Sequence, residues 1–281
     1  MKNFFLPNKV EYLPDEKNPN KGEIIIEPCW PGYGTTWGNT LRRVLLTSLR
    51  GSAVTAVKIK GVKYEFSTIA GIKEDILDII LNLKSLHLKI LKDIEEPIKL
   101  TLKVKGEKKV FASDIEKSSE VEIINPELLI ATITDKNTVL EMDIWVDNGY
   151  GWVPSEEKSR DNLVVDTIIV DSIFSPTLNV SLKVENMRVG KRTDFDRIYI
   201  GIETDGTLSP KSAFLEASSL LKEQFSTLLI LSEEIKIMPE KSIKKKAIKK
   251  EKKVVVLKVM KEKKKLVELP LKKKKKTDKK K

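Results

Sequence analysis

The stretch PGYGTTWGNTLRRVLL, residues 31–46, decides how the first part of the chain folds. Its apolar side chains recur at the 3.6-residue spacing of one helix face. They are Trp37, Leu41, Val44 and Leu45. Thr35 or Thr36 is available as the N-cap, so the pattern predicts a helix over residues 36–49. A strand-like run at residues 23–27 precedes this helix.

The glycines of the connecting turn look like part of a dinucleotide-binding fingerprint. Their spacing is one residue too long, however, and Ile59-Lys60 stands where that motif needs an acid at the end of a second strand. We therefore favour a tight turn in which Gly32 and Gly34 supply backbone angles that other residues resist.

The opposite face of this helix is the sharpest candidate site that the residues alone provide. Leu46 lies opposite Trp37 on a helical wheel, with Arg43 one turn earlier and Arg50 one turn later on the same side. An apolar residue between arginines, on a face directed away from the core, is typical of a protein–protein contact. The alternative is an ordinary solvated face that carries one leucine.

Two further helices are predicted. Residues 72–84 place apolar side chains in helical register, with Glu74 and Asp75 in the first turn, where the helix dipole favours anions. Ser209 and Pro210 are a strong start signal for the third helix. Its apolar stripe is about 140° wide, wider than one sheet requires, so we expect it to meet another helix as well. The stripe consists of Ala213, Phe214, Ala217, Leu220, Leu221, Phe225 and Leu228.

Four segments alternate apolar and polar residues with a period of two, the pattern of strands with one buried face. They begin at Ile98, Leu140, Val180 and Ile198. Such alternation favours antiparallel sheet, because parallel strands are usually apolar on both faces. Together with the three helices, it predicts the α+β class.

The net charge of +11 is concentrated at one end of the 281-residue chain. Residues 236–281 carry 22 lysines and 5 acids, a charge of +17, whereas residues 1–235 have 30 basic and 36 acidic groups, a charge of −6. The last segment has no glycine and only short apolar islands, so we predict a disordered Lys-rich tail. Such a tail is either a solvated segment or an arm that contacts nucleic acid.

Few side chains suit catalysis. With one cysteine, Cys29, and one histidine, His87, zinc sites built on these ligands and most nucleophile–histidine pairs are excluded. We expect Cys29 to be a small buried hydrophobe and His87 to lie at the surface. Catalysis by carboxylates stays open, because the spacing of acids does not reveal their pairing in space. No apolar run suits a signal peptide or a membrane span, so a soluble, cytoplasmic protein is expected.

Three blocks of sequence resemble the bacterial-type RNA polymerase α subunit family. The first is residues 31–46, the second runs from Gly61 to Lys84, and the third runs from Arg192 to Pro210. They occur in the family's order and are distributed over residues 20–230.

The resemblance implies a dimerisation subdomain, an antiparallel sheet with two long helices, formed by residues 1–50 and 175–235. A mixed α/β subdomain, residues 51–174, would be inserted between its halves, and residues 236–281 would follow as the Lys-rich flexible tail. The first and third helices would pack against their copies in a homodimer. The residues implied are Trp37, Leu41, Phe214, Ala217, Leu220, Leu221, Phe225 and Leu228.

By position, Arg43 and Leu46 match family residues that contact the β subunit, while Lys84 and Val170 match residues tied to β′. The chain would be a scaffold without catalytic residues of its own in a nucleotidyltransferase, associated with the nucleoid. Omega and sigma would join it in the holoenzyme. It would bind no cofactor, since the Mg²⁺ belongs to the catalytic subunits.

The end of the chain departs from the family, which usually carries a small helical C-terminal domain that binds promoter DNA. The 46 residues after Ile235 contain no glycine and do not resemble that domain. We expect nonspecific contact of this tail with DNA or RNA in its place. The alternative function is a stand-alone nucleic-acid-binding protein that acts through the basic tail.

Overall fold

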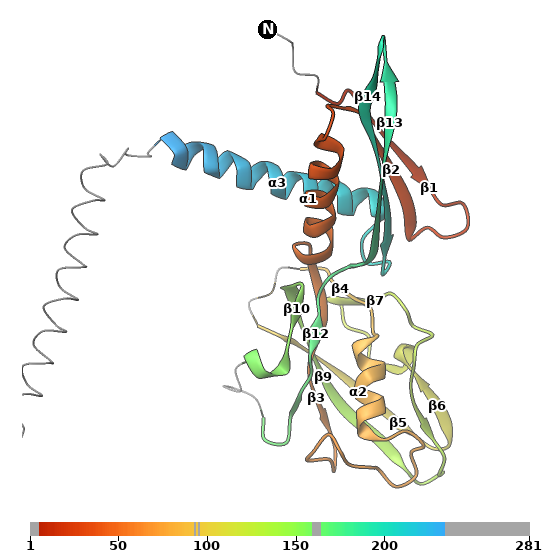
Figure 1. The fold of residues 1–281 in the computed structure, drawn as a ribbon. Coiled ribbons are helices and arrows are strands. Elements are labelled where there is room, and N and C mark those ends of the chain that lie inside the picture. Colours follow the sequence, from red (N-terminus) through yellow and green to blue (C-terminus); the bar gives the residue numbers. More distant parts are fainter. Residues whose placement is uncertain (1–5, 93, 95, 159–163, 234–281) are drawn as a thin grey trace, which may run out of the picture. The chain divides into compact units, whose positions relative to one another are not determined.

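The computed structural model describes residues 6–92, 94, 96–158 and 164–233. In these ranges the chain forms three α-helices and mostly antiparallel strands, which confirms the predicted α+β class (Figure 1). The predicted Lys-rich tail, residues 236–281, lies outside the described residues.

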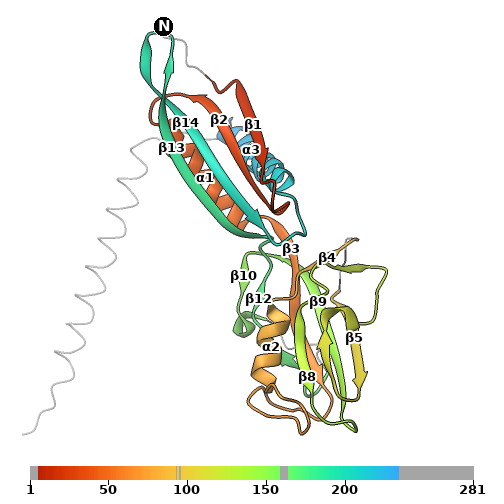
Figure 2. The same cartoon turned by 90° about the vertical axis from the view of Figure 1, so that its right-hand side faces the viewer.

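The first sheet combines segments that are far apart in the sequence. In sheet order, its antiparallel strands are β1 (Lys9–Pro14), β2 (Lys21–Cys29), β14 (Arg192–Thr204) and β13 (Thr177–Val189). α1 (Tyr33–Thr47) and the first part of α3 (Pro210–Glu233) lie on the same face of this sheet (Figures 1 and 2). Because side chains alternate along a strand, every second residue of β2 and β14 is buried beneath these helices.

The second sheet is built from the middle of the chain. In sheet order, its strands are β5 (Ile98–Lys105), β9 (Val139–Tyr150), β3 (Arg50–Ile59), β4 (Leu88–Ile90) and β7 (Val121–Ile123), and β11 (Ile168–Ile169) also pairs with β3. α2 (Ile76–Lys84) packs with it. The smaller elements are the pair β6 (Lys108–Phe111) and β8 (Leu129–Ile133), the pair β10 (Trp152–Val153) and β12 (Ser172–Ile173), and the 3-10 turns η1 (Ala112–Asp114) and η2 (Ser155–Glu157).

The four predicted strands are all present, as parts of β5, β9, β13 and β14. The buried apolar residues form two clusters. One joins β2, α1, β13, β14 and α3, and the other joins the elements from β3 to β11. Two clusters suit a chain that returns to its first sheet after building a second one.

The first helix begins at Tyr33, three residues earlier than predicted, and Thr35 and Thr36 do not cap it. Gly32 precedes it with φ 82°, which confirms the backbone angle expected at this glycine. Gly34 lies within the helix and has no left-handed backbone angle, so that part of the prediction was wrong. The carboxylate of Asp196, on β14, performs the capping. Its Oδ2 accepts hydrogen bonds from the backbone N–H of Gly32 at 2.9 Å and of Gly34 at 3.0 Å. The cap was missed because its residue lies 162 positions further along the chain.

The second helix is shorter than predicted. It begins at Ile76, and the Asp75 side chain accepts from the backbone N–H of Asp78 at 2.7 Å as the N-cap. Glu74 turns away and accepts from the Thr132 backbone N–H at 2.6 Å, so its expected place in the first helical turn was wrong. The start of the third helix is confirmed, because Pro210 is its first residue and Ser209 Oγ accepts from the Ser212 backbone N–H at 3.2 Å.

Candidate subunit-docking surfaces

The face of α1 that meets the first sheet is lined by glycine. A Cβ atom on Gly34 would lie 2.7 Å from Val184 Cγ1, and one on Gly38 would lie 2.4 Å from Leu182 Cδ1. Both distances are shorter than real contacts allow, so the backbone of α1 lies directly on β13 and β14 because these positions lack side chains. The helix is thereby fixed at the closest approach to the sheet that its backbone permits.

This close packing of α1 on the first sheet, which we call the seat of α1, changes the orientation predicted for Leu46. The buried face is centred on Gly34, Gly38 and Leu45, and Trp37 and Leu46 flank it, both partly buried and packed against the core. The prediction that Leu46 lies on a face directed away from the core was therefore wrong. The reason is that glycine gives no apolar signal, which displaced the predicted centre toward Trp37. Arg43 is exposed, as expected.

Asp196 also bears on the dinucleotide alternative. In a nucleotide-binding turn, the N–H groups at the helix start bind phosphate. Here the Asp196 carboxylate, 7% exposed, already accepts from Gly32 and Gly34. A phosphate at this place would meet a negative charge instead of free donors, which argues against a nucleotide there.

Lys84 and Val170 lie in one neighbourhood of the second sheet. Lys84 Nζ, at the end of α2, is 3.4 Å from Asp171 Oδ2, and Asp171 Oδ1 accepts from the Ser155 backbone N–H at 2.9 Å. The hydrogen bonds from Ser155, followed by the attraction of Lys84, lower the pKa of Asp171. Val170 is only 2% exposed, so its side chain belongs to the core and is closed to a partner.

Lys158 joins the same cluster and was not found from the sequence. Its ammonium group donates to Val170 O, to Ser172 Oγ at 2.5 Å and to Thr55 O at 3.5 Å. Ser172 Oγ in turn donates to Val54 O at 2.6 Å. Burial lowers the pKa of Lys158 to about 8, against the attraction of Asp171 and Asp147. These bonds tie the η2 turn to β3 and β12.

The residues predicted for dimerisation differ in exposure. Leu41 and Ala217 are buried in the chain's own core, where they seat α1 and α3 on the sheet. Trp37, Phe214, Leu220 and Leu221 are partly buried, and Phe225 and Leu228 are exposed. Leu229, Ile230 and Leu231, which the stripe did not include, are also exposed. The open apolar surface of α3 therefore lies at its C-terminal end.

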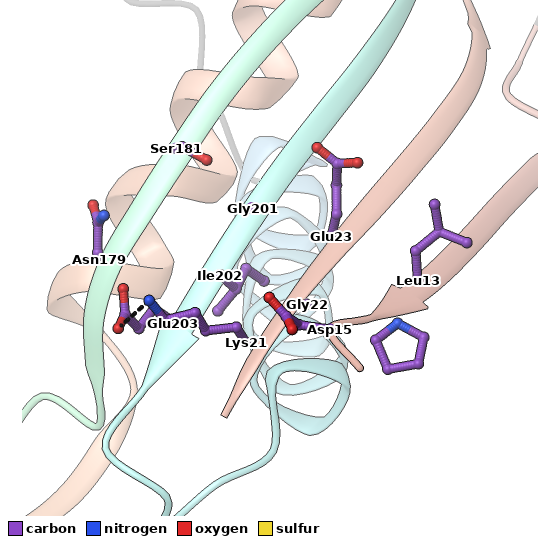
Figure 3. A pocket seen from close by; sticks show the side chains of 11 residues that line it. Leu13, Asp15, Lys21, Gly22, Glu23, Asn179, Ser181, Gly201, Ile202 and Glu203 are labelled. Atoms are coloured by element: carbon purple, nitrogen blue, oxygen red, sulfur yellow. Dashed lines mark ion pairs between the residues drawn. The ribbon is translucent and has the colours of Figure 1, made fainter. Parts of the chain in front are cut away.

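The outer face of the first sheet carries a shallow hollow of about 370 Å³. Figure 3 shows carboxylates of Asp15, Glu23 and Glu203 around it, with Lys21 paired to Glu203 at 2.9 Å. Of the residues that line it, none is a histidine or a cysteine. An exposed ion pair of this kind contributes little to stability, and the arrangement is that of a solvated sheet face.

The structure also places the remaining candidates for chemistry. Cys29 is buried, as expected, and burial raises the pKa of its thiol to about 11, which keeps it protonated. His87 is partly buried. Within the described ranges, no three His, Cys, Asp or Glu side chains are grouped so that they could hold a metal ion. Over the same ranges, no helix is both long and apolar enough to cross a membrane.

Comparison with known proteins relates these surfaces to a family. A family model described as the RNA polymerase Rpb3/RpoA insert domain matches residues 57–175. A DNA-directed RNA polymerase subunit alpha from Leptospira biflexa is 40% identical over 236 residues, which cover 84% of this chain and 72% of that protein. The same subunit from Alkaliphilus metalliredigens is 42% identical over 244 residues, 87% of this chain and 76% of the relative. That from Symbiobacterium thermophilum is 43% identical over 236 residues, 83% and 74% of the two chains.

The chain belongs to the RNA polymerase α subunit family. The resemblance noted from the three sequence blocks is thereby confirmed. The alternative of a stand-alone nucleic-acid-binding protein gains no support from these relatives.

Within this family member, sequence reasoning missed two contacts that position the candidate surfaces, those of Asp196 and Lys158. Neither side chain bonds to its near neighbours in the sequence. Asp196 bonds across 162 and 164 positions, and Lys158 bonds across 103 to Thr55. The only local signal for Asp196 was a charged residue that interrupts the alternation of β14 on its buried face.

Proposed function

We propose that this chain is a non-catalytic, homodimeric scaffold of a DNA-directed RNA polymerase, on which the large β and β′ subunits assemble. The observation that carries the proposal is the apolar end of α3. Phe225, Leu228, Leu229, Ile230 and Leu231 are all more than half exposed within one chain. A contiguous apolar surface of this kind is typical of a protein–protein contact, and the relatives are named as polymerase subunits.

The dimer would form about a two-fold axis, so that each chain contributes the same surface. We assign the contact to α3 together with the partly buried flank of α1 that includes Trp37. The division into a dimerisation subdomain, residues 1–50 and 175–235, and an inserted subdomain, residues 51–174, belongs to the same proposal. It is supported by the two separate apolar clusters and by the insert-domain match to residues 57–175.

The contacts with the large subunits would lie on both parts of the chain. We assign Arg43 and Leu46 to β, with Arg43 as the main contact because Leu46 is partly covered by its own core. We assign Lys84 to β′, through its partly buried pairing with Asp171, while Val170 would support this surface from below. Omega and sigma would join the assembled enzyme near the nucleoid, and the catalytic Mg²⁺ would be held by the large subunits.

Sedimentation and assembly test this function. We expect the purified full chain to sediment as a dimer at micromolar concentration and to recover both large subunits when co-expressed with them. Arg43→Ala should keep the dimer but lower recovery of β about tenfold, because truncation leaves a partner group unpaired. Arg188→Ala, an arginine of the β13–β14 hairpin, is the matched control. A stable monomer that recovers neither subunit would refute the scaffold.

A second proposal concerns the Lys-rich tail. Its +17 charge supports nonspecific contact with DNA or RNA near the polymerase. For Z neutralised phosphates, the slope of log affinity against log salt is about −0.9Z, and removal of residues 236–281 from the dimer should flatten it. An unchanged slope would show instead that the tail serves solubility alone.

A further inference from the structure

The second sheet ends at two strands that do not pair with each other, β5 and β7. Residues 116–120 run from one of these strands to the other. The Glu116 backbone N–H donates to Thr101 O on β5 at 2.9 Å. At the other end, Glu120 O accepts at 2.9 Å from the backbone N–H of Leu91, which follows β4, the neighbour of β7. These residues therefore bridge the gap between the two strands.

The bridge lines one side of a hollow of about 630 Å³, larger than the hollow on the first sheet. We call it the β5–β7 hollow. Three of its lining side chains, Leu100, Ile115 and Val121, belong to the apolar core of the second sheet and are buried. Leu91 also lines it and is 55% exposed. A hollow of this size that opens onto core side chains can take an apolar group.

The charges of the β5–β7 hollow are mainly negative. Glu116 and Glu122 line it with exposed side chains, and Lys117 is the one cation among its lining residues. Neither carboxylate forms an ion pair with a residue that the structure describes. An occupant with an apolar centre and positive charge on either side of it would therefore complement the hollow. A nucleic acid would not, because its phosphates would meet the two carboxylates.

The Lys-rich tail contains a segment of this composition. Residues 254–257 are three valines followed by a leucine, the longest apolar run of the tail, and Lys252, Lys253 and Lys258 flank it. We propose that residues 254–257 dock in the β5–β7 hollow of their own chain, with the flanking lysines beside Glu116 and Glu122. This contact goes beyond the scaffold function, because it requires neither a second copy of the chain nor a large subunit.

The tail is long enough to reach the hollow. Leu91 also lines a second hollow, together with Leu208 and Glu216 at the start of α3. α3 has 24 residues and is about 36 Å long, and residues 234–253, which follow it, extend to about 70 Å at most. A tether of this kind raises the effective concentration of the docking segment, so a contact that is weak between separate molecules can be populated within one chain.

Cross-linking of the purified full chain tests the contact. A carbodiimide joins a carboxylate to a lysine amine beside it, and mass spectrometry then measures the amount of each joined pair of peptides. The reaction is run at about 0.5 M salt, which screens the general attraction between exposed charges. We expect tail lysines to be joined to Glu116 or Glu122 about tenfold more often than to Asp15 or Glu16, which are exposed carboxylates of the first sheet's β1–β2 connection.

Variants separate the apolar contact from charge attraction. Val255→Ser together with Leu257→Ser keeps every lysine and changes no described residue, and it should lower the joining to Glu116 and Glu122 about tenfold. Leu91→Ser should lower it as well, because Leu91 lines the hollow. Leu81→Ser, at an exposed leucine of α2 that does not line the hollow, is the control and should leave it unchanged.

Three results would overturn the docking. The first is joining that is as frequent at Asp15 and Glu16 as at the hollow, which would show charge attraction alone. The second is joining that the paired serine variant of the tail leaves unchanged. The third is joining only between different chains, seen when isotope-labelled and unlabelled chains are mixed. None of these results bears on dimerisation or on recovery of the large subunits, so the scaffold function is tested separately.

Discussion

The two long helices of this chain, α1 and α3, differ in how far their apolar faces are buried within the chain. α1 places Gly34 and Gly38 against the first sheet, and the backbone N–H groups of Gly32 and Gly34 at its start donate to Asp196. α3 buries Ala213 and Ala217 near its start. Its C-terminal end, from Phe225 onward, leaves large apolar side chains exposed.

The difference distinguishes an apolar helix face that is buried within one chain from one that only a partner could bury. The contacts of α1 with the first sheet and with Asp196 all form within the chain, so a change there should alter folding stability. The end of α3 has exposed apolar surface whose burial is favourable but which the described chain does not cover, so a change there should act on association. The predictions below test this separation, from the largest expected effect to the smallest.

The largest effect is expected at the end of α3. Replacing Phe225 and Leu228 together by serine should raise the dimer dissociation constant at least about 100-fold, because burying each such side chain contributes roughly 2 kcal/mol and each dimer contains two copies. The secondary-structure content of the chain should stay the same, because both side chains are exposed in the single chain. Sedimentation at a series of concentrations measures the first quantity and circular dichroism the second.

The matched control is Leu81→Ser, since Leu81 is an exposed leucine on another helix, α2. It should leave the dimer unchanged. If the Phe225 and Leu228 variant dimerises as strongly as the unmodified chain, the apolar end of α3 is not the contact, and the contrast between the two helices loses its functional meaning.

A smaller effect, on folding, is expected from Gly34→Val. The new side chain would meet Val184 and the Asp196 carboxylate at less than 3 Å, so α1 must move away from β14 or shift its cap. Overpacking of this kind costs about 3 kcal/mol of unfolding free energy, which urea denaturation measures. Thr35→Val places the same residue one position further, on an exposed part of the helix, and should cost less than about 1 kcal/mol. Equal stabilities for the two variants would contradict the close seat.

These two helices also show how far the sequence leads. Both helices and the principal strands were predictable, because their apolar residues recur with the correct period. The start of α3 was predictable from Ser209 and Pro210, since a side-chain cap and a proline act on their immediate neighbours. A helix start marked by such neighbouring residues can be predicted from the sequence alone.

The contacts that position the candidate surfaces could not be predicted, for a physical reason. The seat of α1 depends on the absence of side chains at Gly34 and Gly38, and absence leaves no apolar pattern. Its cap depends on Asp196, brought close only after β14 pairs with β2. The same limit misplaced Leu46 and left Val170 as an expected contact although it is buried. Which apolar residues stay exposed, such as Trp152, also depends on the whole fold.

The smallest effect is expected at Lys158, at the base of the ribbon formed by β10 and β12. The apolar side chains Trp152 and Ile173 of this ribbon are exposed, whereas its base is held by hydrogen bonds within the chain. Burial, with a smaller contribution from Lys84, lowers the pKa of Lys158 from an ordinary value of 10.5 to about 8 and outweighs the attraction of Asp171 and Asp147. Between these two pH values the unfolded chain binds more protons than the folded one. The contribution of this residue to the free energy of unfolding should therefore rise with pH from about 8 to 10.5, by roughly 2 kcal/mol once solvent screening of the half-buried amine is allowed for.

Lys158→Met tests this, because methionine fills similar space but has no titrating amine. The difference in unfolding free energy between the unmodified chain and Lys158→Met should grow in favour of the unmodified chain over that window and stay constant below pH 7. Lys89→Met, at an exposed lysine of β4, should show no such growth. A difference that is flat across the window would mean that the amine is solvated, and that the base of the ribbon is held by Asp171 and Ser172 without Lys158. The pair β10–β12 would then be less rigidly held than α1 is on the first sheet.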